Sequence, residues 1–214
     1  GPLGRNRLVG NDELFSGQIG QVGTQLDGMG HVGVRVGTED IFYNGFKLSE
    51  FGSARGLMKL GIENMGPLIT RGILLDVART KGVRRLPISY TITQEDLEKA
   101  LVLTGTQIRE GDVVLINTGH GTLWMKDNET FAKTEPGIGM AAAHWLTDRK
   151  IALIGSDNWG IEVIPPEDPE LVAPIHQWTL VRHGVYHLEN LDLESLARDE
   201  VYEFAFVYAA LRLK

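Results

Sequence analysis

The sequence predicts a layered α/β domain with a largely buried sheet, and three observations lead to this prediction. In the second half of the chain, segments with apolar residues at helical spacing alternate with short, continuous apolar runs of strand length. Residues 5–67 are instead dense in glycine and lack helical periodicity, which is typical of turns, loops and short strands. The chain has 214 residues, 43% of them hydrophobic, so it is long enough to bury a sizeable core.

The first regular elements are expected after the glycine-rich segment. Residues 68–77 form an apolar run rich in β-branched side chains, which predicts a buried strand. Thr93 is followed three residues later by Asp96, an N-cap signature, so a helix is expected over residues 94–104. The apolar run 113–116 predicts a second buried strand.

The same alternation continues to the end of the chain. Gly184 is expected to end the helix before it in a left-handed conformation. The remaining predicted elements are, in order, a helix near 140–146, a strand over 151–154, a helix over 171–183, and strands over 185–188 and 204–213.

Composition excludes several classes of protein and of chemistry. A net charge of -7 without a stripe of Lys and Arg argues against nucleic acid as a partner. No run approaches the roughly 18 apolar residues of a membrane span, and none near the start resembles a signal peptide, so no membrane partner and a cytoplasmic location are expected. The absence of Cys excludes disulfides and thiolate ligands. Residues 1–4 are interpreted as a tag remnant, and residues 5–214 as a single domain.

The densest group of polar residues lies between Gln21 and His31. Gln25 and Asp27 are two residues apart, so on an extended segment both side chains point to the same face. A carboxylate, an amide oxygen and an imidazole at this spacing could coordinate one divalent cation or arrange a water beside it. The alternative, left open by spacing alone, is a glycine-rich loop whose Asp and Gln bind their own backbone.

A second polar group lies far along the chain and contains three histidines and a glutamate. His176 lies on a predicted helix, whereas His187 and Glu189 are two apart on the following strand and share a face. His183 is more simply explained as a surface or core histidine without a ligand.

Further candidates follow the predicted strands. His120 and Asp157 each come just after a strand, where α/β sheets commonly place ligand contacts. Trp124 and Trp159 follow the same strand ends and could form the wall of a pocket. Motifs for a nucleophile elbow, a phosphate-binding loop, a dinucleotide site and a zinc protease helix are all absent from the sequence.

Several blocks of the sequence resemble the cyclase family of metal-dependent hydrolases, which includes kynurenine formamidase, isatin hydrolase and a manganese-dependent dienelactone hydrolase. The family signature H-x-G-T-H-x-D-x-P-x-H is matched by Gln21-Val22-Gly23-Thr24-Gln25-Leu26-Asp27-Gly28-Met29-Gly30-His31, similar to a branch with GTQ-x-DG-x-x-H. The resemblance implies the swivelling β/α/β fold of that family. It continues, in order, through Tyr43-Asn44-Gly45, Thr70 to Asp76, Gly111 to Leu115, Pro136-Gly137, Gly155 to Gly160 and His176 to Leu193.

The resemblance also implies roles for individual residues. Asp27 falls on the family's metal-binding Asp, and His31 on a catalytic acid/base. His176 and Glu189 fall on the downstream His and Glu that help to hold metal. Gln21 and Gln25 replace two leading histidines.

Replacing both histidines by Gln removes two imidazole ligands from the family's two-zinc site. One harder ion held by the Gln25 oxygen, Asp27 and His176 becomes the expected arrangement, with Mn²⁺ preferred and Zn²⁺ the alternative. Gln21, together with His120, Trp124, Asp157 and Trp159, is then expected to contact substrate.

The implied activity is hydrolysis of an amide, lactone or cyclic imide by a metal-activated water. His31 would move the proton, and Glu189 would orient His31 or bind the metal. The expected partners are a small-molecule substrate and further copies of the chain in a homo-oligomer, such as a homodimer. The chain is expected to lack the family's N- and C-terminal segments.

Two rival classes remain at this stage. The loss of two motif histidines also fits a non-catalytic binding protein that kept the fold and lost its metal. A structural or assembly subunit is the third possibility, and it predicts a large exposed apolar patch.

Overall fold

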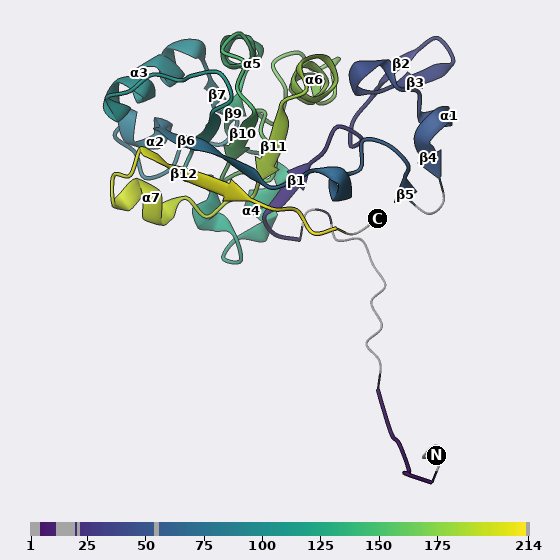
Figure 1. Cartoon of the computed structure of the whole chain (residues 1–214). Helices are drawn as coiled ribbons and strands as arrows, with labels where there is room; N and C mark the ends of the chain where they lie inside the picture. Colours follow the sequence, from purple (N-terminus) through teal and green to yellow (C-terminus); the bar gives the residue numbers. More distant parts are fainter. Residues whose placement is uncertain (1–4, 12–19, 21, 54–55, 213–214) are drawn as a thin grey trace.

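A six-stranded sheet forms the centre of the computed structural model, which describes residues 5–11, 20, 22–53 and 56–212 (Figure 1). The strand order is β1-β11-β10-β8-β6-β12. The inner strands run parallel to one another, and only β1 and β12 at the two edges are antiparallel to their neighbours. The predicted α/β class, with a mostly parallel sheet, is therefore confirmed.

The strands of this sheet are β1 (Gln25–Asp27), β6 (Leu68–Asp76), β8 (Val113–Asn117), β10 (Leu153–Ser156), β11 (Tyr186–Glu189) and β12 (Glu203–Tyr208). Three small two-stranded pairs add β2 (Val34–Val36) with β3 (Glu39–Ile41), β4 (Gly52–Ser53) with β5 (Gly56–Leu57), and β7 (Thr91–Ile92) with β9 (Gly137–Ile138).

The α-helices are α1 (Leu48–Phe51), α2 (Val77–Thr80), α3 (Gln94–Thr104), α4 (Asn128–Lys133), α5 (Met140–Thr147), α6 (Pro174–His176) and α7 (Glu194–Arg198). Short 3₁₀ turns are η1 (Tyr43–Gly45), η2 (Ile62–Asn64) and η3 (His120–Leu123), and α6 continues directly into a π-helix, η4 (Gln177–His183).

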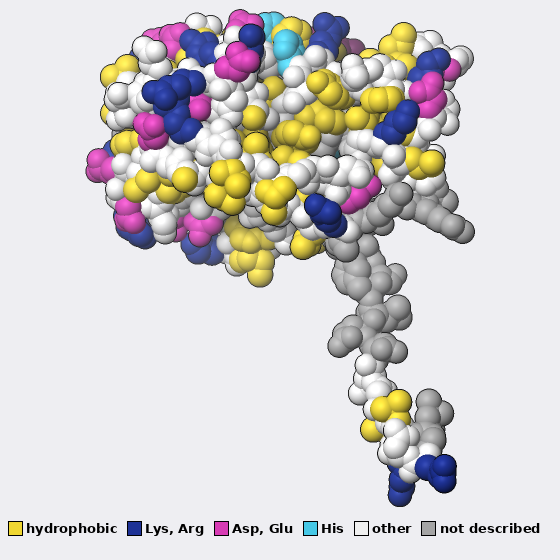
Figure 2. Space-filling view, viewed as in Figure 1, with side chains coloured by type: hydrophobic (Ala, Val, Ile, Leu, Met, Phe, Trp, Pro, Cys, Tyr) yellow, Lys and Arg dark blue, Asp and Glu magenta, His cyan; other side chains and the backbone are white. Residues whose placement is uncertain are grey.

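Two hydrophobic clusters cover the two faces of the sheet. Ile73, Ile116 and Ile154 point into the larger cluster, where they meet side chains from α2, α3 and α5. These helices lie together on one side of the sheet (Figure 1). On the opposite face a smaller cluster includes Leu74 and Leu188 and is packed by β12 and α7. In the space-filling view, hydrophobic side chains gather around the middle of the visible face (Figure 2).

Most predicted elements are confirmed, including the strand over 68–77, the helix over 94–104 and the short elements of the glycine-rich segment. Thr93 and Asp96 form a complete capping box, in which each side chain accepts a hydrogen bond from the other residue's backbone N–H. Gly184 ends η4 in the left-handed conformation, as expected, with φ of 64°.

Three boundaries differ from the prediction. β10 begins two residues later than residue 151, at Leu153, which pairs with Val113. The helix expected from residue 171 begins at Pro174, because Ala173 is left-handed and cannot continue a right-handed helix. β12 ends at Tyr208, and as an edge strand it alternates between exposed residues and buried or half-buried ones rather than being buried on both faces.

No helix in the described ranges is long and apolar enough to cross a membrane. Residues 1–4, interpreted as a tag remnant, lie outside the described residues. The single domain over residues 5–214, the cytoplasmic location and the homo-oligomeric state stay predictions.

The capping box at the start of α3 yields a stability prediction. Thr93→Ala removes the hydroxyl that accepts the N–H of Asp96, so the free energy of unfolding should fall by about 1 kcal/mol. Urea unfolding followed by circular dichroism measures this. The matched control Thr38→Ala, at an exposed position in the β2–β3 turn, should change it by less than about 0.5 kcal/mol. Equal effects of both substitutions would contradict the assigned role of the cap.

Candidate metal centre

The antiparallel pairing of β1 with β11 brings four polar side chains onto one face of the sheet. Gln25 lies directly opposite Glu189, and Asp27 lies directly opposite His187. Because alternate residues of a strand share a face, both pairs point to the same side. The intervening Leu26 and Leu188 point the other way, into the smaller hydrophobic cluster.

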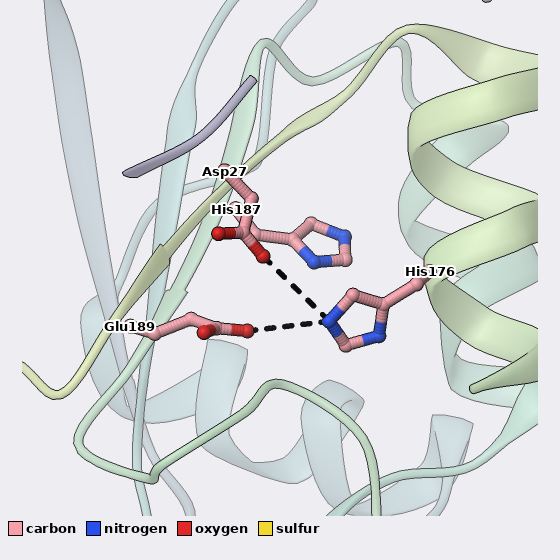
Figure 3. Close-up of side chains that lie close together, drawn as sticks. All are labelled: Asp27, His176, His187 and Glu189. Atoms are coloured by element: carbon pink, nitrogen blue, oxygen red, sulfur yellow. Dashed lines mark ion pairs between the residues drawn. The ribbon is translucent and has the colours of Figure 1, made fainter. Parts of the chain in front are cut away.

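His176 approaches this group from the helix that covers the same face. Glu162 orients its ring: one carboxylate oxygen accepts both the backbone N–H of His176, at 3.1 Å, and the Nδ1–H of its ring. Nε2 then faces Asp27 Oδ2 at 3.7 Å and Glu189 Oε1 at 3.3 Å, as the dashed lines in Figure 3 show. The helix widens to a π-helix just after His176, a distortion frequent at functional sites.

The proton positions on His187 follow from its hydrogen bonds. The hydroxyl of Thr179 donates to the carbonyl of Ile175, at 2.6 Å, so it can only accept from His187. Nε2 of His187 therefore carries the proton, and Nδ1 has a lone pair. Burial, followed by the charges of His176 and His31, holds the pKa of His187 well below its usual value, so the ring is neutral.

Asp27, His176, His187 and Glu189 fit a divalent cation. Each can offer one ligand atom, and these atoms all lie within 4.8 Å of one another. Asp27 Oδ2 and His187 Nδ1 are buried and have no hydrogen-bond partner, as expected for atoms placed to bind a metal. Two carboxylates with two imidazoles form a mixed oxygen and nitrogen set that suits Mn²⁺ or Zn²⁺.

Without a metal, His176 is protonated and is held between the carboxylates of Glu162 and Glu189. Burial lowers the pKa of His176, but its hydrogen bonds to Glu162 and Glu189 outweigh this and raise the pKa to about 10. Burial and the charge of Glu189 raise the pKa of Asp27 to about 7, even though His176 opposes the shift. A bound divalent cation would therefore have to displace these protons.

A cavity of about 400 Å³ opens onto the cluster. Its polar lining includes His31, Glu135, Glu162, His176 and Glu189. Most of the remaining wall is apolar: Val32, Trp159, Val163, Ile164, Pro166, Leu171, Val172 and Ala173. Trp159, predicted to form the wall of a pocket, does so here.

His31 stands at the edge of this cavity. Its side chain is half exposed, and Nε2 lies 3.5 Å from Asp27 Oδ2. Burial and the charge of His176 lower the pKa of His31 below its ordinary value, so the imidazole is neutral at pH 7 and can accept a proton.

The structure brings together Asp27, His31, His176 and Glu189, four predicted site residues from two segments that lie about 150 residues apart in the sequence. Gln25 lies beside them: its Nε2 donates to Glu189 Oε2 at 2.9 Å and is 3.3 Å from Asp27 Oδ1. Both partners are carboxylates, which only accept, so the nitrogen end of the amide faces the cluster.

The other candidates lie elsewhere. Trp124 and Asp157 line a separate cavity of about 280 Å³. His120 is buried, stacks on Phe131 and hydrogen-bonds its carbonyl through Nε2 at 3.1 Å. Gln21 lies outside the described residues. Contacts of these four residues with substrate stay predictions.

Three residues of the site received no role from the sequence, although His187 was named in the second polar group. His187 had a usable signal, since its spacing from Glu189 places both on one face of a strand. Glu162 and Glu135 had none, because both meet the site through contacts that only the folded chain creates.

Two comparisons with known proteins point to the same family. The cyclase family model, described as "Putative cyclase", matches residues 15–163. A crystal structure of a novel cyclase is 33% identical, with a TM-score of 0.79 over 90% of this chain. No curated protein sequence matches the chain.

Two isatin hydrolases share the fold at lower identity. One, bound to the product analogue thioisatinate, is 20% identical with a TM-score of 0.53 over 76% of this chain. Isatin hydrolase A from Labrenzia aggregata is 15% identical with a TM-score of 0.54, and the match covers 89% of this chain and 78% of that one. The chain spans 64% of the novel cyclase and 61% of the first isatin hydrolase, less than two thirds of either.

The raised pKa values predict a steep pH dependence of metal affinity. Between about pH 7 and pH 10, binding displaces one proton from His176, so affinity should rise roughly tenfold per pH unit. Below about pH 7, Asp27 must also lose a proton, and the slope should approach roughly a hundredfold per unit. Titration calorimetry with Mn²⁺ from about pH 5.5 to 8, in two buffers of different ionisation enthalpy, counts the released protons. A flat profile would contradict the proton-shared cluster.

Proposed function

The chain belongs to the cyclase family, and from that premise we propose that it is a metal-dependent hydrolase that cleaves a C–N or C–O bond of an amide, lactone or cyclic imide. The observation that carries this proposal is the convergence of Asp27, His176, His187 and Glu189 on one space, with His176 and Glu189 also lining a cavity. A purely structural subunit would have no use for four closely spaced ligand groups, three of them buried, beside a pocket of substrate size.

We propose Asp27, His176, His187 and Glu189 as the metal-holding residues, with Mn²⁺ preferred over Zn²⁺. A divalent metal held there would supply a Lewis acid for a carbonyl oxygen and acidify a water. His187 takes the ligand role that the resemblance gave to Gln25. The amide of Gln25 instead donates to Glu189 and steadies that carboxylate.

His31 moves the proton in this proposal. Its neutral imidazole is 3.5 Å from Asp27 and half exposed at the edge of the cavity, so it can reach a water beside the cluster. The ring accepts the proton that the attacking water loses as its oxygen bonds to the substrate carbonyl carbon. It then returns this proton to the nitrogen or oxygen that leaves.

Glu162 is a positioning residue for the same site. Its hydrogen bond to Nδ1 of His176 fixes the ring so that Nε2 faces Asp27 and Glu189. Such carboxylate–histidine pairs hold metal ligands in place and make the imidazole more basic.

Asp27→Asn tests the metal site. The substitution keeps the shape of the side chain but removes its charge, so Mn²⁺ affinity should fall at least about a hundredfold and turnover should be lost. Elemental analysis of protein loaded with Mn²⁺ and desalted is the measurement, with Asp40→Asn as control because Asp40 pairs with Arg35 outside the cavity lining. Wild-type protein holding less than about a tenth of an equivalent would instead support the metal-free binding protein.

His31→Gln separates catalysis from metal binding. Without an imidazole to move the proton, kcat should fall roughly 10²- to 10⁴-fold while metal content is unchanged. Steady-state hydrolysis of formamides, lactones and cyclic imides with added Mn²⁺ measures this. His183→Gln is the matched control, since its ring packs beside Trp178 outside the cavity. Full turnover in the His31 variant would contradict the proposed role of His31 in proton transfer.

A further inference from the structure

Glu135 is a buried carboxylate in the cavity wall that the proposed reaction does not use. Only 1% of the surface of Glu135 is exposed to solvent. Oε2 accepts the backbone N–H of Trp159 at 2.8 Å, and Oε1 accepts that of Gly160 at 2.9 Å. The backbone of Glu135 also exchanges two hydrogen bonds with Ile164, at 3.2 and 3.1 Å. Hydrogen bonds therefore hold both the carboxylate and the backbone of Glu135 in place.

No lysine or arginine lines this cavity within the described part of the chain. The other titratable groups of the lining are Glu162, Glu189, His31 and His176, and the charge of His176 is already shared by its own carboxylate partners. An ionised carboxylate has about four acceptor positions, and the backbone fills two of those on Glu135. Burial raises its pKa to about 8 in spite of the two N–H groups, so the free carboxyl is mostly protonated at pH 7 and ionised above about pH 8. A further N–H donor would stabilise the ionised form and lower this pKa.

Gly160 places Glu135 next to the metal cluster. A Cβ atom at this position would be 2.9 Å from Glu135 Oε1 and 3.8 Å from Glu189 Oε1. Gly160 therefore lies between the two carboxylates and has no side chain to fill the space there. A molecule held at the cluster can therefore reach Glu135, with its apolar part against Trp159 and Ile164.

We propose that Glu135 is a specificity-determining residue that accepts a hydrogen bond from an N–H of the substrate, which makes the substrate a lactam, cyclic imide or other N–H amide rather than a lactone. This inference rests on the proposed function. A ring oxygen in place of the N–H would turn its lone pairs toward a buried carboxylate and leave that carboxylate short of a donor. An N-methyl group would do the same and also clash.

Three matched probes test the proposal: isoindolin-1-one, its N-methyl derivative, and phthalide, in which oxygen replaces the N–H. Equilibrium binding to the Mn²⁺-loaded full chain is followed by tryptophan fluorescence and calorimetry. At about pH 8.5, where Glu135 is mostly ionised, wild-type protein should bind the N–H lactam at least roughly tenfold more tightly than either analogue, as expected for a hydrogen bond to a charged group.

Glu135→Gln should reduce this preference to within about threefold, because Gln is uncharged and keeps a single acceptor oxygen for the two backbone N–H groups of Trp159 and Gly160, while its NH₂ cannot accept a hydrogen bond. Metal content should be unchanged. The control Glu167→Gln should keep the full preference, since Glu167 also accepts a backbone N–H, from Met140 at 2.7 Å, but is exposed and lies outside the cavity lining.

Equal binding of the three probes by wild-type protein would overturn the proposal, as would a tenfold preference that survives in a metal-loaded Glu135→Gln protein. If the Glu135→Gln variant does not fold, Glu135→Asp replaces it, because its shorter side chain moves the carboxylate away from the substrate N–H. An N–H preference as large in Glu135→Asp as in wild-type protein would count against the proposal. Binding is measured apart from turnover. A preserved preference without any hydrolysis would refute only the hydrolase, whereas hydrolysis without preference would refute only the role of Glu135.

Discussion

The antiparallel ladder between β1 and β11 is the interaction on which the site depends. It sets Asp27 directly opposite His187, and Gln25 directly opposite Glu189, with all four on one face. Because the side-chain period of a strand is two, a slip of β1 by one residue would turn Gln25 and Asp27 toward the hydrophobic cluster and bring Leu26 to the cavity. Leu26 and Leu188, buried on the other face, oppose such a slip.

The charge balance of the cavity explains its chemistry. Carboxylates outnumber cationic side chains around it, so the metal-free protein holds protons on His176 and Asp27. The same excess favours a divalent cation at the cluster and a hydrogen-bond donor at Glu135. Both preferences come from carboxylates held where water cannot easily screen them, since an unneutralised buried charge is costly.

Helix and sheet contribute different parts of this site. The sheet supplies Asp27, His187 and Glu189 on a rigid ladder, whereas the helix beginning at Pro174 supplies only His176. Glu162 joins the two parts by holding the ring of His176. In the proposed site, the imidazole of His187 on the neighbouring strand takes the ligand place of the signature histidine that Gln25 replaces at the start of β1.

Local structure and the residue types available for the site can be predicted from the sequence. Apolar runs, the capping box at Thr93 and the alternation of Asp27 with its neighbours are local patterns, and each element they predicted is present within a few residues. The absence of Cys limited the ligands to oxygen and imidazole nitrogen. The contacts that bring His187 to the cluster, Glu162 to His176 and Glu135 to the cavity arise instead from the folded arrangement of the chain. These contacts join segments far apart in the chain, and strand order and register are set by packing of the whole sheet, which no short pattern encodes.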